Sequence, residues 1–216
     1  MKSLLKKLDS AIGSIYAIDT SLQVNDFVLT PQPVRKTGAL LVKSQTTSSG
    51  KTDIEVGIVF HPQVAEDLNT VDPTNLSQWT ASQTQAFAVA AEEVSHFRYL
   101  VFHAEKDRAV SQLELEFQGE IDKFLLFFFL KTSEASDSQE AFDQLFSGLF
   151  EQFKLVEGLT PEQTERYWEA NQLAREFIQK HRPQFCSPQA ITILLQELRA
   201  LYRMSSTEKF SLRHRL

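Results

Sequence analysis

The sequence predicts an α+β protein in which a small antiparallel sheet of about three strands precedes a bundle of five or six α-helices. Three observations lead to this prediction. Strand-like segments occur only before residue 61, helical periodicity dominates after residue 77, and the two kinds of segment do not alternate as they would in a doubly wound sheet. The 216 residues are expected to form a single domain (1–216), with a mainly β portion with an N-terminal helix at 1–76 and a helical portion at 77–216.

The N-terminal portion is expected to begin with a short helix over residues 2–16. Three short segments rich in branched apolar residues follow it, each bounded by Pro, Gly or Ser/Thr clusters, at 24–29, 39–43 and 54–60. The polar stretch between the second and third segments predicts a turn, so these two strands should form an antiparallel hairpin. His61 precedes Pro62 and is interpreted as a turn residue rather than a ligand.

The helical portion is divided by capping residues and short polar breaks. Ser138 and Thr160 stand at two expected N-termini, and Pro161 suits the first helical position. The expected helices cover residues 82–105, 109–130, 138–153, 161–181 and a last segment from Ser187–Pro188 to about Arg203. Most of the 17 phenylalanines lie between residues 87 and 153 at helical spacing, which is typical of core packing.

Composition excludes some classes of partner. Lys and Arg number 22 against 28 acidic residues, a net charge of −6, and basic residues cluster only at the two ends, so nucleic acid is not an expected partner. The longest apolar run, 124–130, is far shorter than the ~20 residues that span a bilayer. The N-terminus lacks the pattern of a signal peptide, and Cys186 is the only cysteine, so we expect a cytoplasmic protein. Cys186 is interpreted either as a buried thiol or as one whose pKa is lowered at a helix start.

Residues 92–96, Glu-Glu-Val-Ser-His, are the main candidate for a functional site. Two carboxylates and an imidazole within a buried helix are costly unless they have partners. Glu92 and His96 are four residues apart, so both can reach one metal ion. Tyr99 and His103 continue the same stripe and are possible accessory residues.

The following helix offers a second pair of candidate ligands. Glu116 and Glu120 are also four residues apart, and two antiparallel helices would bring them opposite Glu92 and His96. The expected metal ligands are therefore Glu92, His96, Glu116 and Glu120. A donor set this rich in oxygen predicts one divalent transition metal, Zn, Mn or Fe.

Residues 39–130 resemble the minimal zincin metallopeptidases: a hairpin, then the helix with Glu92-Glu-Val-Ser-His96, then a helix with downstream acids. In that family the motif is HExxH, with two zinc-binding histidines and a glutamate that activates water. The resemblance implies that His96 is the second zinc ligand, Glu93 the catalytic base, and Glu116 or Glu120 a third ligand. Glu92 replaces the first histidine, so the chain is expected to be an atypical or inactive hydrolase.

Two other interpretations stay open. The chain can be a non-enzymatic interaction or structural protein that binds a protein partner or itself through its C-terminal helices, in which case no metal need bind. It can also be a ferritin-like di-iron protein, because Glu93 and His96 have the Glu-x-x-His spacing of such bundles. A di-iron site requires a second copy of that motif, and the sequence lacks one.

Overall fold

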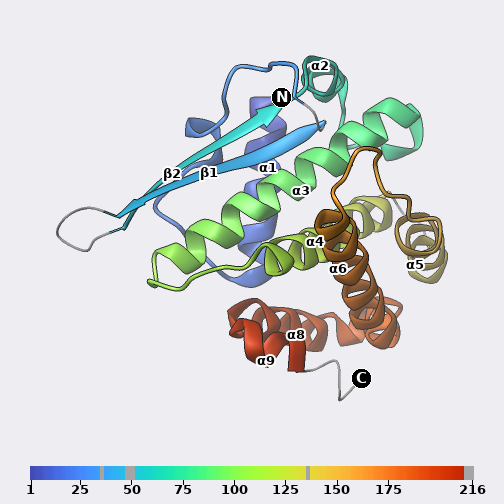
Figure 1. The fold of residues 1–216 in the computed structure, drawn as a ribbon. Coiled ribbons are helices and arrows are strands. Elements are labelled where there is room, and N and C mark those ends of the chain that lie inside the picture. Colours follow the sequence, from blue (N-terminus) through green and yellow to red (C-terminus); the bar gives the residue numbers. More distant parts are fainter. Residues whose placement is uncertain (35–36, 47–51, 135–136, 212–216) are drawn as a thin grey trace.

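The computed structural model describes residues 1–34, 37–46, 52–134 and 137–211 (Figure 1). It confirms the α+β class, because the described residues form one antiparallel hairpin and mainly α-helices otherwise. The strands are β1 (Gly38–Thr46) and β2 (Thr52–Phe60). The helices of the described ranges are α1 (Lys2–Tyr16), α2 (Pro62–Thr70), α3 (Ala81–Ala104), α4 (Gln112–Ser133), α5 (Ser138–Phe146), α6 (Pro161–Lys180), α7 (Arg182–Phe185), α8 (Ile191–Arg203) and α9 (Ser206–Ser211). There are also short 3-10 turns at Val24–Asp26, Leu76–Gln78 and Pro188–Ala190, and a π-helical segment at Ser147–Glu151.

The predicted number of strands was wrong by one. The expected strand at 24–29 begins instead with the 3-10 turn Val24–Asp26, and only Val28 forms a parallel bridge, to Ile58. Asn25 and Asp26 lie in the middle of this segment, and both residue types favour turns over strands. The described sheet therefore has two strands, and the expected pairing between them is confirmed.

Three short helices, α2, α7 and α9, were not expected from the sequence. The first of them explains His61, which is the N-cap of α2 and accepts a hydrogen bond from the amide of Gln63 at 3.3 Å. His61 thus satisfies one of the free amides of a helix start, with Pro62 at the first helical position.

The hairpin lies along one side of α3 (Figure 1). Its base is buried, with Ile58 and Phe60 inaccessible to solvent. At the start of β1, a Cβ on Gly38 would stand 2.6 Å from Cγ1 of Val89 and 3.2 Å from Cγ of Glu93. Glycine therefore allows the strand to approach the turn of α3 that carries Glu93.

Helix α3 is the central element and packs against α1, α2, β1 and α4. A capping box of Thr80 and Gln83 starts it. His96, Tyr99 and His103, which share the polar stripe of this helix, are all buried because neighbouring elements surround the helix. The polar groups of this stripe consequently need partners inside the protein.

Helix α4 runs beside α3, and α6 crosses α4 (Figure 1). The phenylalanines form the expected core here, with stacked or edge-to-face rings. The rings in contact around Phe124 are those of Phe128, Phe142, Phe150 and Phe185. None of the helices within the described ranges is both long and apolar enough to cross a bilayer.

The C-terminal helices return to the N-terminal one. On α8, Arg199 donates to the carbonyl of Ile15 at 2.9 Å, and Arg203 donates to those of Tyr16 and Ala17 at 3.0 Å. These guanidinium groups satisfy carbonyls at the C-terminus of α1, where positive charge is favourable.

Cys186 precedes α8 in the chain. Burial raises the pKa of its thiol, so the interpretation of a lowered thiol pKa was wrong.

Candidate metal centre

Three helices converge at the candidate site. Because residues three and four apart share one face of a helix, each helix presents a row of polar side chains to the others. The residues concerned are Glu92, Glu93 and His96 on α3, Glu116, Glu120 and Lys123 on α4, and Arg166, Tyr167 and Asn171 on α6, with Gly119 of α4 next to His96.

Glu92, His96 and Glu116 form the core of this site. Each offers one ligand atom, and these atoms lie within 4.8 Å of one another. Nε2 of His96 is 3.6 Å from Oε2 of Glu116. Ligand atoms of a tetrahedral zinc site with bonds of about 2.1 Å are about 3.4 Å apart, so this pair already has a suitable separation. The sequence-based expectation that α3 and α4 bring these residues together is therefore realised for three of the four candidate ligands.

The imidazole of His96 is held in a narrow position. The residue is 7% exposed, and its Nε2 atom has no hydrogen-bond partner among the described residues. A Cβ on Gly119 would stand 2.9 Å from this nitrogen, so any larger residue at that position of α4 would press on the ring. Glycine therefore leaves this position beside the nitrogen open.

Glu93 lies at the other nitrogen of the same ring. Its Oε2 atom is 3.7 Å from Nδ1 of His96, whereas Glu116 is at Nε2. Burial opposes a charge on His96, but the neighbouring carboxylates of Glu93, Glu116 and Glu92 outweigh it and raise the pKa of His96 to about 9. The histidine is thus flanked by acids on both edges.

Glu120 is not part of the group of three. Its Oε1 atom accepts a hydrogen bond from Nζ of Lys123 at 2.7 Å, and its Oε2 atom accepts one from Asn171 at 3.4 Å. Burial raises the pKa of Glu120, an effect that the ammonium of Lys123 opposes. Lys123 also donates to Oε2 of Glu92 at 2.9 Å, so its ammonium links Glu92 to Glu120.

Helix α6 covers the opposite side of Glu116. Nε of Arg166 is 3.8 Å from Oε1 of Glu116. Burial, together with the charges of Glu116 and Glu92, raises the pKa of Tyr167, so its phenol stays protonated. The neutral phenol is a hydrogen-bond donor for the carboxylate of Glu116, whereas the guanidinium contributes an ion pair.

The fixed charges of the site do not balance. Four carboxylates (Glu92, Glu93, Glu116, Glu120) carry −4 when ionised, and two cations (Lys123, Arg166) carry +2. The remainder is −4 + 2 = −2 with a neutral histidine, and −1 when His96 carries a proton. Buried charge of one sign is costly, and a divalent cation would neutralise it.

Tyr99 and His103, the expected accessory residues, contact another set of residues. The hydroxyl of Tyr99 accepts from Lys209 at 2.7 Å and contacts Glu114 at 3.2 Å. Nε2 of His103 is 3.0 Å from the carbonyl of Tyr202. Burial lowers the pKa of His103 to about 4, so it is neutral and donates to that carbonyl.

Several residues of the site were missed from the sequence. Lys123 could have been found, because it is three residues after Glu120 and seven after Glu116 on one helical face. Gly119 and the residues of α6 gave no local signal, since only tertiary packing brings them to His96 and Glu116.

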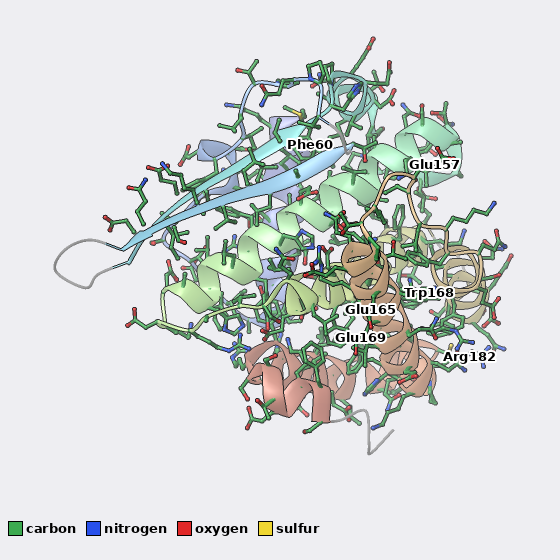
Figure 2. The ribbon with its side chains drawn as sticks, in the orientation of Figure 1. Phe60, Glu157, Glu165, Trp168, Glu169 and Arg182 are labelled. Atoms are coloured by element: carbon green, nitrogen blue, oxygen red, sulfur yellow. The ribbon has the colours of Figure 1, made fainter. Side chains whose placement is uncertain are left out.

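A surface cavity of about 670 Å³ lies elsewhere on α6, lined by Glu165, Trp168 and Glu169 among others. Figure 2 shows these three side chains along that helix. Its lining does not include Glu92, His96 or Glu116, so this cavity does not give a substrate access to the candidate centre.

Comparison of the chain with known proteins finds no matching family model, no similar curated protein and no similar solved structure.

Proposed function

We propose that the protein binds one divalent transition metal ion through Glu92, His96 and Glu116. The observation that supports this most strongly is the buried Nε2 atom of His96, which has no hydrogen-bond partner among the described residues and faces Glu116 at 3.6 Å. An unsatisfied buried polar atom costs about 1–3 kcal/mol, and a metal bond at this nitrogen would remove that cost. The glycine at position 119 supplies the room.

The donor set bears on which ion would bind. Two carboxylate oxygens and one imidazole nitrogen suit Mn(II) and Fe(II) as well as Zn(II). A bound divalent ion would supply Lewis acidity, and two carboxylate ligands would reduce it relative to a site with neutral histidines. The excess negative charge of the site is −1 while His96 is protonated and becomes −2 when a bound ion displaces that proton, which favours a divalent ion over a monovalent one.

The position of Glu93 favours binding over hydrolysis. A general base for a metal-bound water has to lie near the metal, on the Nε2 side of His96, whereas Glu93 lies beside Nδ1. A carboxylate at the non-ligating nitrogen fixes the tautomer and orientation of a ligating histidine. We therefore propose that Glu93 is a positioning residue, and that a zincin-like domain of this kind is an atypical or inactive hydrolase.

Metal analysis of the purified protein tests the proposal. We expect about one Zn, Mn or Fe ion per chain after loading and dialysis, and no stoichiometric ion in His96→Ala. His103→Ala is the matched control, because His103 lies on the same helix and is also buried. The wild-type protein without a bound ion, or His96→Ala that retains it, would contradict the proposal.

A second candidate function is association through the C-terminal helices. It is supported by Trp168 on α6, whose side chain is 49% exposed beside a surface cavity. Sedimentation velocity of wild-type protein and Trp168→Ala tests it. A concentration-dependent dimer that the substitution abolishes would support self-association, and a monomer at all concentrations would oppose it.

A further inference from the structure

We infer that Lys123 occupies the position of a second cation next to the proposed metal ion and so restricts the centre to one ion. This inference rests on the proposed function, because it concerns the number of ions that the same centre takes. It assigns to Lys123 a role in specificity that neither the motif at 92–96 nor its spacing indicates.

The ammonium of Lys123 lies where a bridging cation would lie. It contacts Oε2 of Glu92 at 2.9 Å and Oε1 of Glu120 at 2.7 Å. Its side chain is only 12% exposed, so solvent does little to screen these contacts. Glu120 is fixed in turn by the amide of Asn171 from α6.

Glu92 belongs to two groups at once. It contributes an oxygen to the candidate site with His96 and Glu116, and it accepts a hydrogen bond from Lys123. In dinuclear centres, carboxylates bridge two ions that are about 3.5–4 Å apart. Glu92 therefore has the place of a bridging ligand, with the proposed ion on one side and the lysine ammonium on the other.

The remaining donors match this arrangement. Dinuclear carboxylate bundles use several glutamates and histidines that project inward from neighbouring helices. Glu92, Glu116 and Glu120 supply such carboxylates here, but a fixed positive charge stands between two of them. A second divalent ion would have to displace that charge, so reactions that need two adjacent metal ions are not open to the wild-type centre.

Lys123→Ala tests this inference by removing the ammonium while leaving Glu92 and Glu120 in place. We expect the wild-type protein to bind one Mn(II) ion per chain and Lys123→Ala to bind two, as measured by calorimetric titration and metal analysis. Magnetic coupling between two neighbouring Mn(II) ions in the electron paramagnetic resonance spectrum of the variant would place the second ion next to the first.

Lys123→Met/Glu120→Gln is the matched control. It also removes the ammonium, but it neutralises the second carboxylate and fills the space with an apolar chain of similar length, so it should bind one ion. Lys123→Ala is prepared with Mn(II) present, because two carboxylates then lack their cation. A variant that binds one ion, or fails to fold even with Mn(II), would overturn the inference and leave the proposed function standing.

The number of ions bound by the wild-type protein distinguishes a failure of the proposed function from a failure of the role inferred for Lys123. A wild-type protein that binds no ion would contradict the proposed function itself. A wild-type protein that binds two ions would contradict only the role of Lys123.

Discussion

Helices α3 and α4 carry two buried polar clusters that are adjacent in sequence and differ in how their polar atoms are satisfied. We call the first the Glu–His cluster, formed by Glu92, Glu93, His96 and Glu116, and the second the Asp122 network, formed by Tyr16, Ser95, Gln118 and Asp122. Ser95 and His96 are neighbours in the chain, so their side chains leave α3 about 100° apart and enter different environments.

In the Asp122 network the charged group is fully hydrogen-bonded. Ser95 donates to Oδ2 of Asp122 at 2.5 Å, Tyr16 donates to Oδ1 at 2.5 Å, and Gln118 donates to the same oxygen at 3.1 Å. The atoms here that lack a hydrogen-bond partner among the described residues, such as Oε1 of Gln118, belong to neutral groups. The network is closed, and it links α1, α3 and α4 without any further component.

The Glu–His cluster has the opposite property. Oε2 of Glu93 and Nε2 of His96 are buried without a hydrogen-bond partner among the described residues, both belong to ionisable groups, and their ion pairs are long, at 3.7 Å and 3.6 Å. A buried neutral atom that lacks a hydrogen bond destabilises the folded state less than a buried charged atom that lacks one. The difference teaches that burial and acidity alone do not mark a site: the Asp122 network has both and needs no ligand, while the Glu–His cluster is incomplete by itself.

The largest expected effect on stability is in the Asp122 network. Asp122→Ala removes the acceptor of three buried hydrogen bonds, although Gln118 still donates to Tyr16, and should lower the free energy of unfolding by about 3–4 kcal/mol. Urea unfolding with and without metal measures this loss of unfolding free energy, which should be the same in both conditions.

Glu116→Gln is the counterpart in the Glu–His cluster. It should abolish the stabilisation by metal while changing the unfolding free energy of the metal-free protein little. If added metal rescued Asp122→Ala, the two clusters would not be independent.

A pH effect should also separate the two regions. Burial, opposed by the donors Ser95, Tyr16 and Gln118, raises the pKa of Asp122 from 3.8 to about 6. A carboxyl whose pKa is raised on folding favours the folded state most at low pH, and this contribution is lost as pH rises from about 4 through about 6. At 1.36 kcal/mol per pKa unit the change is about 2–3 kcal/mol.

Asp122→Asn removes this titration. We expect its stability relative to the wild-type protein to increase between about pH 4 and pH 6, as measured by urea unfolding at several pH values. Asp19→Asn, at an exposed position, controls for the removal of one carboxylate. A stability difference for Asp122→Asn that stays constant across this range would show that the carboxyl titrates normally.

The fold was predictable where local signals and tertiary packing agree. Thr80, Ser111 and Thr160 cap helices that the sequence already indicated, and the hairpin follows from two branched segments around a polar turn. The prediction of a strand at 24–29 failed because the branched residues of this segment flank an Asn-Asp pair that forms a turn. The short helices α2, α7 and α9 lie below the length at which hydrophobic periodicity can be read.

The candidate site was predictable only along each helix. The spacing of Glu92 and His96, and the presence of Glu116 on the next helix, indicated residues that the structure brings together. Glu116 and Glu120 share one face of α4 but lie about 6 Å apart along its axis, so the position of α4 along that axis decides which of them reaches His96, and no sequence pattern sets that position. The ammonium of Lys123 donates a hydrogen bond to Glu120, so the expected set of four ligands becomes a set of three.

The smallest expected effect concerns the fit of α4 against His96. In Gly119→Ala the new methyl group would stand 2.9 Å from Nε2, so the ring must move by a few tenths of an ångström or more. We expect a loss of about 1–2 kcal/mol in unfolding free energy from this overpacking, and about a tenfold weaker metal affinity because the ligand is displaced.

Gly148→Ala is the matched control for this change. A Cβ at position 148 meets no atom within 4 Å, so the substitution should leave metal affinity unchanged and slightly stabilise the fold by restricting the unfolded chain. Differential scanning calorimetry and metal titration of both variants measure the contrast. Since position 119 faces the Glu–His cluster and not Asp122, metal binding should fall in Gly119→Ala while the pH dependence assigned to Asp122 persists. Equal metal affinity in Gly119→Ala and wild-type protein would mean that the space beside Nε2 is not where the ion binds.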